Sequence, residues 1–188
     1  MIKAADHLAN NLEKYRNYLN VLAKLQIDPR LHGKIDVSGV VQQTLLEAYQ
    51  ELGRSQLPSV NQQVGWLRRI LTNNLADEMR KLTTEKRSVG REIPLDAVTG
   101  SSSRIQAWLA ADQSSPSRHK ERQEEALRLA EALAKLPEAQ RDALVLQHWH
   151  GWSLAQIAQH LGRSTAAVAG LLKRGLQDLR AQLQNDRE

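Results

Sequence analysis

The stretch from Ser153 to Leu179 constrains the fold more than any other, because it predicts two short helices joined by a tight turn. Its sequence is SLAQIAQHLGRSTAAVAGLLKRGLQDL. In its first half, apolar residues recur at i, i+3, i+4 and i+7, as on one face of a helix: Leu154, Ile157, Ala158 and Leu161. Helical spacing returns in the second half, at Val168, Leu172, Leu176 and Leu179.

The residues at the ends of these two helices suit helix caps. Ser153 and Gln156 form a capping-box pattern before the first helix. Gly162 follows its last apolar residue, where a left-handed residue is favoured, and Ser164 can cap the second helix. This order is typical of a helix-turn-helix, whose second helix enters the major groove of DNA with its N-terminal residues at the base edges. An ordinary helical hairpin in a bundle is the alternative.

The composition favours an all-α protein. Of the 188 residues, 41% are apolar but only 4% are aromatic, and Phe is absent, so the core must be built from Leu, Val, Ile and Ala. The net charge of +5 is compatible with a polyanionic partner. With no cysteine, disulfides and thiolate metal sites are excluded. Since no apolar run resembles a signal peptide or a membrane span, we expect the cytoplasm.

The first part of the chain predicts three helices. Helical spacing covers Ala4 to Leu25 and, after a break at residues 27–34, Val37 to Leu52 with Asp36 as its cap. The inward residues of this second helix are predicted to be Val37, Val40, Val41, Thr44, Leu45, Ala48, Tyr49 and Leu52. Its opposite face is polar apart from Leu46, which suits a partner surface as well as an ordinary exposed leucine.

The third predicted helix runs from Gln62 to Thr83, after a loop at Gly53 to Asn61. Its inward residues are predicted to be Trp66, Ile70, Leu71, Leu75, Met79 and Leu82. Between Arg68 and Arg91 there are seven basic and three acidic residues, interleaved with Thr72, Asn73 and Asn74. This is either a solvated helix face or a surface for phosphates and unpaired bases.

Composition divides the chain into two helical domains. Residues 93–117 are rich in Ser, Gly and Pro and predict a flexible linker with a short helix near Ile105 to Ala111. We therefore expect a domain at 1–92, a linker at 93–117 and a second small domain at 118–188. Helices are predicted at Arg118 to Leu136 and Glu138 to His150 in the second domain, ahead of the helix-turn-helix.

Two segments resemble bacterial RNA polymerase sigma factors of the sigma-70 family. Region 4 is resembled by LPEAQRDALVLQHWHGWSLAQIAQHLGRSTAAVAGLLKRGLQDLR, and region 2 by DVSGVVQQTLLEAYQEL and VGWLRRILTNNLADEMRK. Two such domains joined only by a linker are similar to the extracytoplasmic-function (ECF) group, and the phrases VVQQTLLEAY and AAVAGLLKRGL look most like its planctomycete variants. The resemblance implies a factor that binds core polymerase and directs promoter-specific initiation, with no catalysis and no cofactor of its own.

The resemblance also implies roles for individual residues. The residues expected to contact the β′ clamp helices are Gln42, Gln43, Leu46 and Glu47. The opened −10 strand is met by Trp66, Arg68, Arg69, Asn73, Asn74 and Arg80, with a flipped base near residues 53–61. The −35 duplex is met by Arg163, Ser164, Thr165, Ala167, Lys173 and Arg174. The linker would thread toward the RNA exit channel, and the β flap and an anti-sigma factor are further partners that the resemblance allows.

The chain departs from the ECF pattern in two places. Many ECF factors carry Lys, Ser and Arg in the middle of the recognition helix, where this chain has Ala169, Gly170 and Leu171. None of these can make a charged or bidentate base contact, so −35 readout is expected to be weak, to depend on shape, or to be confined to Arg163, Ser164 and Thr165. Gly170 and Gly175 are each expected to weaken the helix by roughly 1 kcal/mol relative to Ala. Gln43 stands where region 2.2 is usually acidic.

Two other classes of function compete with this interpretation. A stand-alone helix-turn-helix regulator would bind a DNA palindrome as a dimer without polymerase. An enzyme or metal protein is suggested only by His148, His150 and His160. His148 and His150 are two residues apart on a predicted helix and face different sides, and no His-Glu-x-x-His, phosphate loop or nucleophile elbow is present. We therefore expect no metal site.

Overall fold

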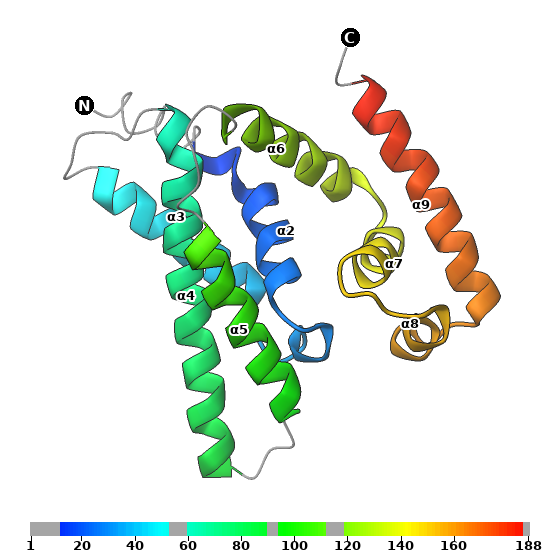
Figure 1. Cartoon of the computed structure of the whole chain (residues 1–188), viewed down its shortest axis with the longest axis horizontal. Helices are drawn as coiled ribbons and strands as arrows, with labels where there is room; N and C mark the ends of the chain where they lie inside the picture. Colours follow the sequence, from blue (N-terminus) through cyan, green and yellow to red (C-terminus); the bar gives the residue numbers. More distant parts are fainter. Residues whose placement is uncertain (1–11, 53–59, 90–93, 112–118, 186–188) are drawn as a thin grey trace. The chain divides into compact units, whose positions relative to one another are not determined.

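The computed structural model describes residues 12–52, 60–89, 94–111 and 119–185. Helices and short turns make up these residues, with no β-strand among them, which confirms the all-α prediction (Figure 1). The chain divides into two compact units, residues 1–123 (unit 1) and 124–188 (unit 2). None of the helices in the described ranges has the length and apolar character needed to span a membrane.

In unit 1, helices pack around the long helix α4, and the first of them are joined by a short 3-10 turn. These elements are α2 (Arg16–Gln26), η1 (Pro29–Leu31), α3 (Val37–Leu52) and α4 (Val60–Val89). α3 contacts both α2 and α4. Their shared core is aliphatic and includes Leu19, Val41, Leu67, Leu71 and Leu75. Two threonines are also fully buried in it, and each hydroxyl donates to the carbonyl one turn earlier, Thr44 to Val40 at 2.8 Å and Thr72 to Arg68 at 2.7 Å.

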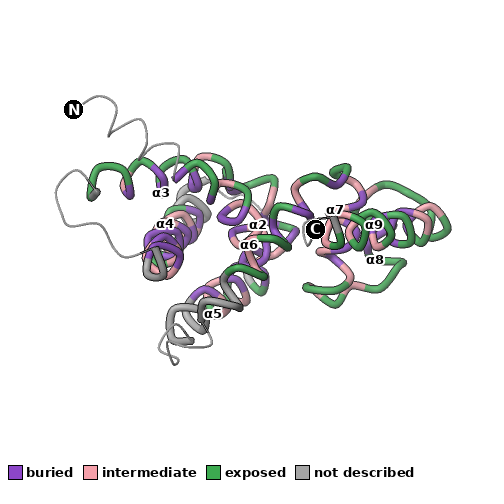
Figure 2. The backbone as a smooth tube through the Cα atoms, turned by 90° about the horizontal axis from the view of Figure 1, so that it is seen from above, coloured by how far each residue is buried: buried purple, intermediate pink, exposed green. Residues whose placement is uncertain are grey.

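The predicted helices of unit 1 are largely confirmed, with differences at their ends. α3 has the predicted bounds, and the Asp36 side chain accepts from the Gly39 amide at 2.9 Å, as a cap should. Its exposed and buried positions alternate around the helix (Figure 2). Tyr49 was predicted inward but is 39% exposed. α2 begins only at Arg16, after a turn at residues 14–15, and residues 1–11 and 53–59 lie outside the described residues.

Residues 95–111 are not a linker but a helix, α5 (Leu95–Ala111), which packs on α4 and α2. It buries Ala97, Val98, Ser101 and Ile105. Polar contacts fix it beside η1: the Asp28 amide donates to Ser101 Oγ at 2.8 Å, and Arg104 Nε donates to the Gln26 carbonyl at 3.2 Å. The flexible linker predicted over 93–117 is therefore wrong for residues 95–104, whereas the short helix predicted near Ile105 to Ala111 is present as the end of α5. Residues 112–118 are outside the described part of the chain.

Charged groups reinforce the contact between η1 and α5. The Arg30 guanidinium binds Asp28 at 2.9 Å and Asp96 at 2.8 Å. Burial raises the pKa of Asp28, but the hydrogen bonds and charge of Arg30 together lower that pKa by more, so the net shift is downward. The bond from Arg30 also lowers the pKa of Asp96, and both carboxylates raise the pKa of Arg30. The pairing therefore favours the charged form of each group.

Unit 2 is organised around α7 and α9. Its helices are α6 (His119–Lys135, which begins before the unit boundary), α7 (Glu138–His148), α8 (Leu154–Leu161) and α9 (Thr165–Asn185). α9 contacts α7 and α8, and α7 contacts α8. The residues buried between them include Ala143, Leu144, Ile157, Val168 and Leu172. These helices agree with the predicted ones to within a few residues.

Candidate nucleic-acid interface

The helix-turn-helix of unit 2 forms for the reasons its sequence predicts. Ser153 Oγ accepts from the Gln156 amide at 3.3 Å, and the Gln156 side chain accepts from the Ser153 amide at 2.9 Å, completing the capping box. Gly162 has φ of 62°, in the left-handed region, and the next amide, that of Arg163, donates to the Ala158 carbonyl at 2.9 Å. Ser164 Oγ accepts from the Ala167 amide at 3.2 Å at the start of α9. All three caps are confirmed.

Packing fixes which side of α9 faces outward. Val168, Leu171 and Leu172 are buried, whereas Ala169 is exposed and Gly170 is half-buried. Leu171 therefore belongs to the core of unit 2 rather than to the exposed side of α9. The predicted −35 residues lie on the open surface: Arg163, Ser164, Thr165, Lys173 and Arg174 are exposed, and Ala167 is half-buried. The start of α9 is thus accessible, with Arg163 just before it, and Lys173 and Arg174 are exposed about two turns further along the helix.

In unit 1, the outward face of α3 is partly apolar. Leu46 is 50% exposed beside the exposed Gln42 and Gln43, and Tyr49 extends the apolar part of this face. Glu47 is half-buried, and its carboxylate accepts from Gln43 at 2.7 Å. Tyr49 was missed in the sequence because its spacing suits the core face as well as the border of the exposed one. We call Gln42, Gln43, Leu46 and Tyr49 the α3 face.

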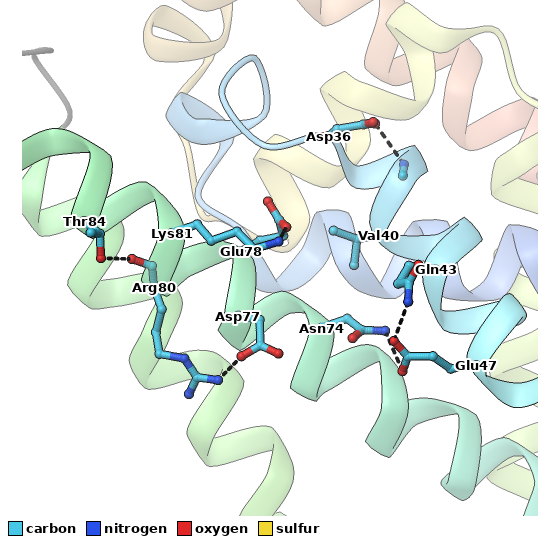
Figure 3. Close-up of a pocket in the computed structure, with 11 residues that line it drawn as sticks. Asp36, Val40, Gln43, Glu47, Asn74, Asp77, Glu78, Arg80, Lys81 and Thr84 are labelled. Atoms are coloured by element: carbon cyan, nitrogen blue, oxygen red, sulfur yellow. Dashed lines mark hydrogen bonds and ion pairs between the residues drawn. The ribbon is translucent and has the colours of Figure 1, made fainter. Parts of the chain in front are cut away.

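A groove of about 790 Å³ lies between α3 and α4 (Figure 3). Asn74 points into it, and its amide donates to Thr44 at 3.2 Å and to Glu47 at 3.3 Å. Four acidic side chains line the groove against two basic ones, and the two basic groups are paired there, Arg80 with Asp77 and Lys81 with Glu78. Asn74 and Arg80 were predicted on the basic strand-binding face but line this acidic groove, which does not suit a phosphate.

The remaining predicted −10 residues lie elsewhere on α4. Arg69 and Asn73 are exposed, and Arg68 is half-buried. Trp66 was predicted inward but is half-buried, and its indole Nε1 donates to Glu51 near the end of α3 at 3.1 Å. Arg69 and Asn73 are therefore accessible for hydrogen bonding, and the half-buried Trp66 offers a ring for stacking.

His160 of unit 2 packs against an aromatic side chain. In the described residues, no group of three His, Cys, Asp or Glu side chains is placed to hold a metal ion. The His160 ring instead packs edge-on against Trp152, with centroids 5.2 Å apart. Trp149 is 57% exposed, and Leu154, which the helical spacing placed on the apolar face of α8, is 37% exposed.

Comparisons with known proteins bear on unit 2. Residues 126–179 match the family model described as "Sigma-70, region 4". Among solved structures, the chain is similar to one in the "Cocrystal structure of the flagellar sigma/anti-sigma complex, Sigma-28/FlgM", with 15% identity and a TM-score of 0.36 over 98% of this chain and 97% of that one. No curated protein matches the chain. The family match thus places a sigma-70 region 4 domain at residues 126–179, on part of α6, α7, α8 and most of α9.

Proposed function

We propose that the chain is a sigma factor of the ECF type, which binds core RNA polymerase and directs it to initiate at specific promoters. One observation carries the proposal: the region 4 match falls on a helix-turn-helix whose Ser164 and Thr165 are open to solvent. In this proposal α9 enters the major groove of the −35 duplex. Arg163, Lys173 and Arg174 supply phosphate and base contacts, so binding weakens as salt rises.

Unit 1 takes the two other tasks of the proposed factor. The α3 face docks on the β′ clamp helices, since an exposed Leu46 and Tyr49 offer apolar area to a partner. Trp66, Arg69 and Asn73 hold the separated −10 strand, where base stacking is worth about 1–3 kcal/mol per base and offsets the cost of unstacking. In this proposal the Asn74 amide can bind the separated strand only after its hydrogen bonds to Thr44 and Glu47 break.

Run-off transcription with core RNA polymerase tests the proposal. The full chain is added to core enzyme on templates carrying candidate promoters, and the expected result is a promoter-specific product that core enzyme alone does not make. No added product would contradict the proposal. A band shift with the chain alone distinguishes a sigma factor from a stand-alone helix-turn-helix regulator. Tight binding to a palindromic duplex without polymerase would favour the regulator.

Two variants separate the tasks within unit 1. Trp66→Ala with Arg69→Ala is expected to reduce strand opening, measured by permanganate reactivity, while core polymerase is still retained in a pull-down. Leu46→Arg is expected to reduce core retention without unfolding unit 1, because position 46 is half exposed. Lost core binding with normal opening in the first variant would refute the assignment of Trp66 and Arg69.

A further inference from the structure

Gly170 leaves a space on α9 that the side chain of Arg174 fills. A Cβ built at Gly170 would lie 3.3 Å from Arg174 Nη1, 3.7 Å from Nη2 and 3.8 Å from Cζ. The guanidinium therefore rests against the helix backbone one turn before its own Cα. This direction is natural, because side chains on a helix tilt toward its N-terminus.

The position of this guanidinium matters because the first two turns of α9 lack charge. From Thr165 to Leu172 the helix is uncharged, and its first cations are Lys173 and Arg174. Val168, Leu171 and Leu172 face the core, so Gly170 and Arg174 lie on the side of α9 away from it. Because its guanidinium lies over Gly170, Arg174 places a charged, planar hydrogen-bond donor on the otherwise uncharged stretch from Thr165 to Leu172.

We infer that Gly170 is a positioning residue whose missing side chain holds Arg174 where it reads a guanine in the −35 duplex. A guanidinium can donate two bonds at once to the O6 and N7 of guanine, which no other base pair offers in the same arrangement. Gly is otherwise a poor choice in the middle of a helix, and Ala would favour the helix more. This inference rests on the proposed function, since it takes α9 as the recognition helix.

The experiment uses the full chain with core polymerase and a pool of linear templates in which about ten base pairs, one turn of duplex, are randomised upstream of the start site. Templates retained in the holoenzyme complex are sequenced. The parent chain is expected to enrich one guanine, and Arg174→Ala to reduce that enrichment about tenfold. Gly170→Ala and Gly170→Leu are expected to reduce it progressively, because each displaces the guanidinium further.

Three controls keep the outcome specific. Gly170→Ala is expected to raise the melting temperature of the chain, so its loss of base preference cannot come from unfolding. Arg180→Ala removes another exposed arginine of α9 and is expected to keep the guanine preference. In an Arg174→Ala background, Gly170→Ala should have no further effect on that preference.

The outcomes separate this inference from the proposed function. If the parent chain selects templates and transcribes them but Gly170→Ala keeps the full guanine preference, the inference is overturned and the sigma-factor proposal stands. An equal loss from Gly170→Ala with and without Arg174 overturns it as well. If the parent chain selects no template with core polymerase, both proposals fail.

Discussion

Gly175 of α9 lies so close to Leu144 of α7 that a Cβ at position 175 would stand 3.1 Å from Leu144 Cδ1. The same Cβ would be 3.3 Å from Gln140 Cβ, on the same face of α7. Glycine at this buried position lets α7 and α9 approach each other closely. The packing gained at this contact offsets the helix-weakening effect that glycine is expected to have.

This contact predicts opposite results for two glycines of one helix. Gly175→Ala is expected to lower the free energy of unfolding by about 1–3 kcal/mol, because the added methyl group overpacks the α7–α9 contact. Gly170→Ala is expected to raise it by up to about 1 kcal/mol, since only the movable end of Arg174 must shift. Urea unfolding followed by circular dichroism measures both, and a stabilised Gly175→Ala would contradict the packing described.

The capping box gives a second prediction. Ser153→Ala removes the acceptor for the Gln156 amide and is expected to destabilise unit 2 by about 1 kcal/mol. Ser153→Thr keeps a hydroxyl and serves as the matched control. Thermal melts of the two variants should differ, and identical melts would mean that the cap contributes nothing measurable.

The bond between α5 and η1 gives a third prediction. Ser101→Ala leaves the part-buried Asp28 amide without its acceptor, which costs about 1–3 kcal/mol of stability in unit 1. Ser103 lies on the same helix but is exposed, so Ser103→Ala should change the free energy of unfolding by less than about 0.5 kcal/mol. Hydrogen exchange of the Asp28 amide is a direct check, and it should accelerate only in Ser101→Ala.

The Arg30 ion pairs predict a dependence on acid. Because the pKa values of Asp28 and Asp96 are lowered in the folded chain, their contribution to stability is present above the ordinary aspartate pKa of about 4. It is lost as the pH falls below that value and through their folded pKa values. Arg30→Gln should therefore narrow the difference in stability between pH 6 and pH 3, measured by urea unfolding. An unchanged pH profile in that variant would exclude these pairs as a source of acid sensitivity.

Most of the helices could be predicted from the sequence because their signals are local. The capping box at Ser153, the left-handed Gly162 and the spacing along α3 each depend on residues within a few positions of one another. The exposed start of α9 follows from the same pattern, since the apolar residues fix which side is buried.

The sequence misled where tertiary contacts override composition. The run Thr99-Gly100-Ser101-Ser102-Ser103 is typical of a linker, yet Ser101 is fully buried and bonded to residue 28, far away in the chain. Asn74 has an amide that suits DNA, but the carboxylate of Glu47 that engages it is on another helix. The contact of Gly170 with Arg174 depends on a side-chain conformation that residue spacing alone does not specify.

The packing of α5 has a practical consequence for cutting the protein into fragments. A fragment that stops at residue 92 would lack Ala97, Val98 and Ile105, and the aliphatic surfaces of α2 and α4 that they cover would be left in water. Such a fragment would be prone to aggregate, whereas a fragment that extends through Ala111 would keep α5, whose apolar side chains cover these surfaces.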